Sequence, residues 1–287
     1  MMTILNRCGS AALLTLLLLG LAAAPASAQK GFKGGEKKGG LKGFKGGGPA
    51  SEPSTSNGAS AGTEGRLSIR ASGIVAVFDP GVRCPPVASP FASTTRYDGS
   101  RRPADRFGGL HGGIDISLAE GTPLLAAAGG RVVHKGEGRQ AEGIYLWLQH
   151  APDDTGLPFW VYSKYQHFRE LPGLAPGAAV RAGQPVGNSG RSGTAGGHYG
   201  AAGYPHLHWT TIAGTSGDYK IVGSLVSTNS PQFIDPLAAY VSGLRAPGDV
   251  GSLPADRKRV AVAHVGRDGA MRPPSARLVW PVACAAR

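Results

Sequence analysis

Helical periodicity is almost absent from this sequence. The best candidate for an amphipathic helix is DPLAAYVSGL at residues 235–244, and no other stretch sustains a 3.6-residue repeat. A mainly helical fold is therefore excluded. From Arg66 onward, short β-rich runs such as IYLWLQH, WVYSKYQHF and HLHWTTI alternate with glycine and proline turns. This pattern predicts an all-β domain built from an antiparallel, sandwich-like sheet.

No apolar run is long enough to cross a membrane as a helix, which needs about 20 apolar residues. The run at residues 11–24 follows the positive Arg7 and precedes the small residues ASA at 26–28. This order is typical of a secretory signal peptide. We therefore expect residues 1–28 to be removed and the chain to be exported, either to the periplasm or to the cell wall and exterior.

Cysteine is scarce, with three residues in the whole chain. Cys8 precedes the apolar run of the signal peptide, so it is badly placed to carry a lipid after cleavage. The remaining pair, Cys84 and Cys284, would lie in a compartment where disulfides persist. We expect them to form a disulfide that ties the C-terminal region to the first strand; two unpaired buried thiols are the alternative.

Acidic residues are few, 18 against 30 lysines and arginines, which gives a formal charge of +12. Much of the positive charge lies in residues 29–48, where six lysines and one glutamate are set among glycines. A segment this poor in apolar residues cannot offset its ordering entropy, so we expect it to be disordered. A basic arm outside the cytoplasm suits an anionic envelope surface, and a solubilising spacer is the alternative. No nucleic-acid partner is expected.

These observations divide the chain into four parts. The signal peptide comes first, and the basic arm and a Ser/Pro-rich linker together form the second part. A β domain follows, and a polar, proline-rich C-terminal extension with one or two strand-like runs comes last. We expect the extension to be peripheral, packed on the domain or tethered to it through Cys284. The predicted boundaries are 1–28, 29–65 for arm and linker together, 66–245 and 246–287.

The sequence contains no HExxH motif, so no helix-borne glutamate is available as a general base. Two of its eight histidines, His206 and His208, stand one residue apart in YPHLHW. Alternate side chains of a strand share a face, so both would point at one site. Upstream, GGLHGGIDI supplies His111 and Asp115. With His208 they form a nitrogen–oxygen–nitrogen set that suits zinc with a fourth position left to water, as in catalytic sites.

The run YSKYQHF contributes Tyr165 and His167, which would share one face of a strand. If His208 binds the metal, His206 remains beside it without a bond, and His167 could join it. Two such imidazoles would offer a general base and a partner for a developing oxyanion. The alternative is a set of histidines that merely pack or face solvent.

The order H-x3-D, Y-x-H and H-x-H resembles that of the lysostaphin-type, or LytM-like, peptidoglycan metallopeptidases. HGGIDISLAEGTPLLAAAGGRVVHKG, PGAAVRAGQPVGNSGRSG and IDPLAAY extend the likeness over residues 86–240. The resemblance implies an antiparallel β fold with an open groove, one zinc ion per chain and endopeptidase activity on peptidoglycan cross-bridges. It assigns zinc ligation to His111, Asp115 and His208, and catalysis to His167 and His206.

The chain departs from the family pattern near the HxH motif. Its approach to that motif is long and adds His198 and Tyr199, which with Tyr165 are weaker candidates for substrate contact at the groove rim. Trp209 and Thr210 stand where the family usually has phenylalanine and an acidic residue. These departures bear on substrate choice, and the bond cut could be D-Ala–diaminopimelate or Gly–Gly.

Two other functions compete with that of an exported cell-wall enzyme. A non-catalytic regulator would bind peptidoglycan or activate another hydrolase, but such regulators lose ligands and this chain keeps all five key residues. An electrostatic surface binder would act through the basic arm instead. Of the remaining histidines, we expect His150 to have a structural role and His134 and His264 to lie on the surface.

Overall fold

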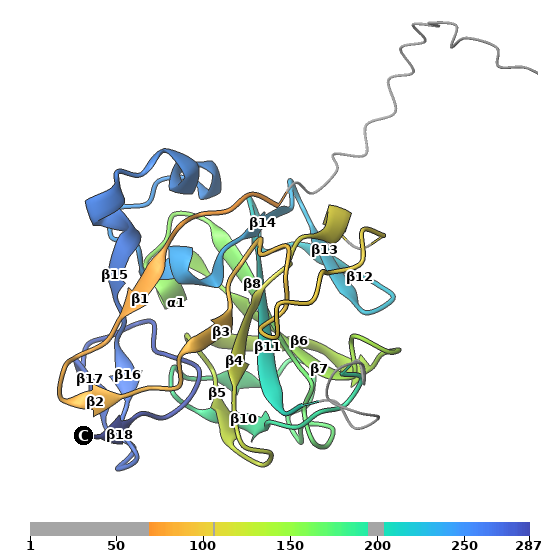
Figure 1. The fold of residues 1–287 in the computed structure, drawn as a ribbon, viewed down its shortest axis with the longest axis horizontal. Coiled ribbons are helices and arrows are strands. Elements are labelled where there is room, and N and C mark those ends of the chain that lie inside the picture. The colour runs from red at the N-terminus through yellow and green to blue at the C-terminus, as the bar shows by residue number, and fades with distance from the viewer. Residues whose placement is uncertain (1–68, 106, 195–203) are drawn as a thin grey trace, which may run out of the picture. The chain divides into compact units, whose positions relative to one another are not determined.

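Strands dominate the computed structural model, which describes residues 69–287 except residues 106 and 195–203 (Figure 1). The described residues lie in one compact unit, assigned to Gly62–Arg287. The predicted all-β fold class is confirmed. The signal peptide, the basic arm, His198 and Tyr199 fall outside the described residues, and the boundaries drawn from the sequence stay predictions.

An antiparallel sheet of eight strands forms the centre of the domain. Its order is β3–β4–β11–β8–β7–β6–β9, and β14 pairs with the far part of β11. The strands are β3 (Val87–Ser89), β4 (Ile114–Ser117), β6 (Gly130–Glu137), β7 (Ile144–His150), β8 (Trp160–Gln166), β9 (Ala179–Val180), β11 (His206–Gly214) and β14 (Gln232–Ile234). The long strands coincide with the β-rich runs of the sequence.

Short pairs of strands and short helices surround this sheet (Figure 1). β5 (Pro123–Leu125) pairs with β10 (Pro185–Asn188), β12 (Tyr219–Val222) with β13 (Leu225–Thr228), and β16 (His264–Val265) with β17 (Met271–Arg272). The helices are α1 (Pro152–Thr155), η1 (Phe107–Gly109), η3 (Pro236–Tyr240), η4 (Pro247–Ser252) and η5 (Ala255–Lys258). The best helix candidate of the sequence thus forms only the 3-10 turn η3, which Asp235 caps by accepting a hydrogen bond from Leu237 N–H.

The C-terminal extension joins the core, although a peripheral position was expected. β15 (Arg259–Ala261) runs parallel to β1 (Val75–Val77), and β18 (Ala285–Ala286) pairs with β2 (Val82–Arg83) (Figure 1). Trp280 is fully buried, and its ring meets Phe78 at 5.2 Å and Trp209 at 6.4 Å between centroids. Its apolar area makes the extension part of the folded unit because burial of aromatic surface is strongly stabilising.

A disulfide joins Cys84 to Cys284, the pair that the sequence favoured. Both cysteines are buried beside the β2–β18 pair, and 200 residues of sequence separate them. Among the described residues, no helix has the length and apolar character needed to span a bilayer.

Candidate metal centre

Three side chains converge at one point, two on neighbouring strands and one just before the first of them. His208 on β11 lies directly opposite Asp115 on β4, and His111 precedes β4 by three residues. Asp115 Oδ1 is 2.8 Å from His208 Nδ1 and 3.1 Å from His111 Nε2, and the two nitrogens are 3.0 Å apart. The structure therefore brings together the three predicted metal ligands.

Glycine allows β4 to approach β11 this closely. A Cβ atom on Gly113 would lie 2.4 Å from the carbonyl oxygen of Trp209 and 2.9 Å from Thr210 Oγ1. A Cβ on Gly112 would press on the ring of Phe107 at 3.0 Å. A larger residue at position 113 would thus push Asp115 away from His208, which explains the second glycine of the HGGID motif; one at position 112 would displace the exposed Phe107 ring.

Each ligand candidate is held from its outer side. His111 Nδ1–H donates to the carbonyl oxygen of Pro90 at 2.9 Å. The Nε2–H of His208 donates to Thr210 Oγ1 at 3.0 Å, and Arg102 Nη2 lies 3.3 Å from Asp115 Oδ2. Such outer contacts fix the tautomer and the direction of metal ligands.

This arrangement fits a metal cation. A carbonyl oxygen only accepts hydrogen bonds, so the contact with Pro90 places the proton of neutral His111 on Nδ1 and leaves a lone pair on Nε2. That lone pair faces an oxygen of Asp115 at 3.1 Å. Two lone pairs at this distance repel unless a cation or a proton lies between them. Two imidazole nitrogens and one carboxylate oxygen are ligands typical of zinc.

Burial and neighbouring charges adjust protonation in the direction a metal site needs. Burial would raise the pKa of Asp115, but the nearby rings of His111, His208 and His206 outweigh it and hold the pKa well below its usual range. Burial lowers the pKa of His208 to about 4, although Asp115 opposes the shift. The cluster therefore presents a carboxylate and a neutral imidazole at neutral pH.

The two remaining histidines of the motifs lie beside the cluster. The rings of His167 and His206 are 4.5 Å apart between centroids, and His206 Nε2 is 3.7 Å from Asp115 Oδ1. His167 Nδ1–H donates to the carbonyl oxygen of Ser192 at 2.7 Å, and His206 Nδ1–H donates to that of Tyr204 at 3.1 Å. Both rings therefore keep Nε2 unprotonated and free to act as a base.

Desolvation keeps this second pair of imidazoles neutral. Burial lowers the pKa of His206. Burial, together with the nearby rings of His206 and His208, lowers the pKa of His167 well below its usual value. A neutral imidazole with a free nitrogen is the form that accepts a proton.

The prediction that Tyr165 contacts substrate is wrong. Its side chain is fully buried on the other face of the sheet, where its hydroxyl accepts a hydrogen bond from Ala127 N–H at 2.8 Å. The reason lies one step along the chain: β8 ends at Gln166, and His167 has a left-handed φ of 66°. That backbone turn breaks the two-residue alternation that would have put Tyr165 and His167 on one face.

The sequence missed an aromatic stack and an arginine at the site. Tyr204 lies parallel to His206, with centroids 4.3 Å apart, and Tyr97 contacts Tyr204 at 4.2 Å. Arg102 reaches both Asp115 and Ser89 Oγ, the latter at 2.8 Å. Tyr204 could have been suspected because it adjoins the PHLH motif, whereas no spacing rule points to Tyr97 or Arg102.

The other histidines have structural surroundings. His150 is buried and hydrogen-bonded to Gly129 O and Ser163 Oγ, which fits the structural role expected of it. His134 is half-buried and hydrogen-bonded to the hydroxyl of Tyr145. His264 is buried, and its expected surface position is wrong because β16 packs into the core with the rest of the extension.

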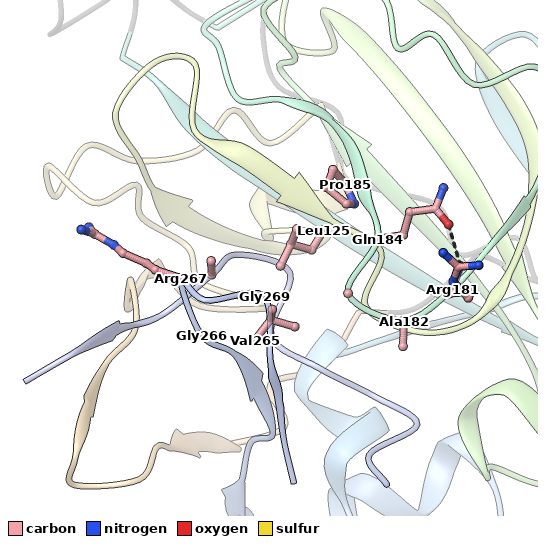
Figure 2. A pocket seen from close by; sticks show the side chains of 11 residues that line it. Leu125, Arg181, Ala182, Gln184, Pro185, Val265, Gly266, Arg267 and Gly269 are labelled. Carbon is pink, nitrogen blue, oxygen red and sulfur yellow. Dashed lines mark hydrogen bonds between the residues drawn. The ribbon is translucent and has the colours of Figure 1, made fainter. Parts of the chain in front are cut away.

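Two cavities in the described part of the chain lie apart from this cluster. One, of about 440 Å³, includes Leu125 and Val265 in its lining and has Arg181 and Arg267 beside it (Figure 2). The other, of about 290 Å³, lies beside Asp235. Neither is lined by a member of the metal cluster or by His167 or His206. The candidate metal centre is therefore distinct from both.

Fold and site together define a β-sheet domain with a metallopeptidase-type cluster. Residues 109–218, which contain the whole cluster, match the family described as Peptidase family M23. This segment is an M23 peptidase domain, and the resemblance to lysostaphin-type and LytM-like peptidases is confirmed.

Individual proteins are similar over parts of the chain. The Lipoprotein NlpD/LppB homolog of Pseudomonas aeruginosa is 34% identical over 113 residues, which are 38% of this chain and 35% of that protein. The chain thus spans about a third of the length of this curated relative.

Solved structures are similar at lower identity. The catalytic domain of lysostaphin from Staphylococcus simulans is 22% identical, with a TM-score of 0.32, over 50% of this chain and 84% of that one. The catalytic domain of the prophage-encoded M23 protein EnpA from Enterococcus faecalis, in a mutant form, is 21% identical, also with a TM-score of 0.32, over 49% of this chain and 87% of that one.

Proposed function

We propose that this protein is an exported zinc endopeptidase that hydrolyses peptide cross-bridges of bacterial peptidoglycan. One observation carries the proposal: His111 Nε2, Asp115 Oδ1 and His208 Nδ1 converge, while His167 and His206 stand beside them with free nitrogens. Three metal ligands next to two neutral bases are the parts that metal-assisted amide hydrolysis needs.

The side chains divide the reaction between them. Zinc bound to the three ligands would polarise the scissile carbonyl and acidify a water molecule. His206 and His167 accept a proton at Nε2 and return it to the leaving nitrogen, because their Nδ1 atoms are committed to backbone carbonyls. Asp115 stays ionised and His208 neutral, so the ligand set keeps its charge at neutral pH.

A regulator of another hydrolase is the competing proposal. Such a protein would bind peptidoglycan and need neither the ligands nor the free histidine nitrogens. All five residues are present here and are oriented by outer hydrogen bonds, which supports the enzyme. Activity on a cross-bridge by the isolated protein distinguishes the two.

The deciding experiment digests defined cross-linked muropeptides and identifies the products by mass. Zinc-loaded protein should cut a D-Ala–diaminopimelate or a Gly–Gly bridge, and the His111→Ala variant should not. A matched His134→Ala variant should behave as wild type, since His134 lies outside the cluster. Intact muropeptides after incubation with the zinc-loaded wild type would overturn the proposal and favour the regulator.

We also propose that the basic arm binds anionic envelope surfaces. Six lysines in residues 29–48 would be attracted to anionic cell-wall or lipid headgroups, and salt would weaken that attraction. Deleting residues 29–65 should reduce sedimentation with sacculi at low salt and leave hydrolysis of soluble muropeptides unchanged. Equal sedimentation of the two forms would contradict the arm's role without touching the enzyme.

A further inference from the structure

The ring of His167 is held by a chain segment outside the metal cluster. Its Nδ1–H donates to the carbonyl oxygen of Ser192 at 2.7 Å. Ser192 in turn packs against the turn between β6 and β7, where its Oγ accepts a hydrogen bond from Ile144 N–H at 2.9 Å. The direction of the free His167 nitrogen therefore depends on where this turn, residues 138–143, is fixed.

The turn and the segment around Ser192 interlock. Ala141 N–H donates to the carbonyl oxygen of Gly193 at 2.5 Å. Gly143 has a φ of 61°, and a Cβ on it would lie 2.0 Å from the oxygen of Ser192. With backbone packed on backbone in this way, a displacement of the turn must displace the Ser192 carbonyl as well.

An ion pair between a buried lysine and a partly exposed glutamate fixes the turn to the sheet. Lys164 on β8 has a side chain that is 4% exposed, and its Nζ donates to the carboxylate of Glu142 within the turn. The same ammonium lies 4.5 Å from the centre of the Tyr145 ring and 5.6 Å from that of Trp147. Gln166 Nε2 also donates to the backbone oxygen of Glu142 at 3.1 Å. Glu142 is thus held at its side chain and its backbone by the end of the strand that leads into His167.

Stability alone does not explain this pair. Burial lowers the pKa of the Lys164 ammonium, with Glu142 opposing the shift, so the charge is kept at a cost in desolvation. Replacing a buried ion pair by apolar residues of similar volume is often neutral or stabilising. Unlike apolar residues, the ion pair supplies a directional anchor between β8 and the turn.

We propose that Lys164 and Glu142 are positioning residues that orient His167 through Ser192. The pair anchors the turn, the turn fixes the Ser192 carbonyl, and that carbonyl holds the Nδ1–H of His167 so that Nε2 faces the metal cluster. The kinetic part of this inference rests on the proposed peptidase function, and the structural part does not.

Two variants and a matched control test the proposal by kinetics. Lys164→Met removes the anchor, and the double variant Lys164→Met with Glu142→Met also removes the unpaired, partly buried charge of Glu142. Both should keep zinc and lose about 10- to 100-fold in kcat with KM within about threefold, because misorientation of a catalytic group costs this much. The double variant should regain stability and not activity. Lys135→Met, a change of the same kind on β6, should leave kcat unchanged.

Nitrogen-15 NMR of the His167 ring tests the structural part in the zinc-loaded protein. The wild type and Lys135→Met should show a single Nδ1–H tautomer with a protected proton, and both Lys164 variants should lose that signature. If the wild type hydrolyses nothing, the proposed function fails while the spectra still decide on the positioning role. An unchanged His167 signature in the folded double variant, or kcat within about threefold of wild type, overturns the proposal.

Discussion

The four imidazoles at the site use their two nitrogens differently. His111, His167 and His206 each donate Nδ1–H to a backbone carbonyl and turn Nε2 inward. His208 does the reverse: Nδ1 faces Asp115 and Nε2–H donates to Thr210. Backbone carbonyls do not titrate, so three of these tautomers are set by the fold itself.

Loss of one inward-facing nitrogen should empty the metal centre. Purified wild type should hold one zinc ion per chain, and His208→Ala should hold little, because two remaining ligands bind zinc poorly. Metal analysis after dialysis measures this, with His134→Ala as the matched control. Full zinc occupancy in His208→Ala would show that the ligand assignment is incorrect.

His167 and His206 should matter for turnover and not for metal content. Replacing either by alanine should leave zinc and folding near wild type and reduce kcat by about 10²- to 10⁴-fold, the usual contribution of a general acid or base. If both serve one transition state, the double variant should be little worse than the worse single one. Turnover within about threefold of wild type in both single variants would refute their catalytic role.

The sequence predicted the cluster well because its members lie within short motifs. H-x3-D and H-x-H specify residues a few positions apart. Strand alternation then predicts that His206 and His208 lie on the same face. Arg102 and Ser192 could not be found in this way, because they reach the site through long-range packing.

At the scale of single elements, strand alternation succeeds along β8 and fails at its end. A left-handed backbone at His167 cannot be read from the sequence, since that conformation is uncommon for histidine and is imposed by neighbouring segments. The strand itself was predicted from its apolar and aromatic residues. The backbone conformation after its last residue places Tyr165 in the core and His167 at the site, and that conformation depends on tertiary context.

A buried histidine at the end of β7 should make the domain sensitive to acid. His150 is buried, its Nδ1–H donates to Gly129 O at 2.5 Å, and its Nε2 accepts from Ser163 Oγ at 2.9 Å. Burial lowers its pKa below 6.5, so the unfolded chain takes up the proton first as pH falls. The stability that neutral His150 contributes is complete above the unfolded-state pKa and is lost as pH falls through the folded one.

Urea unfolding at about pH 7 and about pH 5 measures this effect. The loss in free energy of unfolding between the two pH values should be smaller in His150→Gln than in wild type, because glutamine does not titrate. His134→Gln, changed at a half-buried position, should retain the wild-type loss. An equal loss in all three proteins would contradict the assignment of acid sensitivity to His150.

At the scale of the whole molecule, the disulfide joins distant parts of one core. Reducing Cys84–Cys284, or replacing both cysteines by alanine, should lower the free energy of unfolding by about 2–5 kcal/mol, because the closed loop is long. Denaturant unfolding with and without reductant gives the value. Two thiols open to alkylation in unreduced, denatured protein would show that the bridge is not formed.

Completion of the aromatic core also depends on the order in which the chain is synthesised. Trp280 packs against Trp209 and Phe78, so part of the aromatic core beside β11 is completed by a residue synthesised long after those two rings. A chain that stops before Trp280 would carry the three ligand candidates, His167 and His206 and still expose aromatic surface at Trp209. A chain shortened by premature termination should therefore be degraded by proteases faster than the full-length protein.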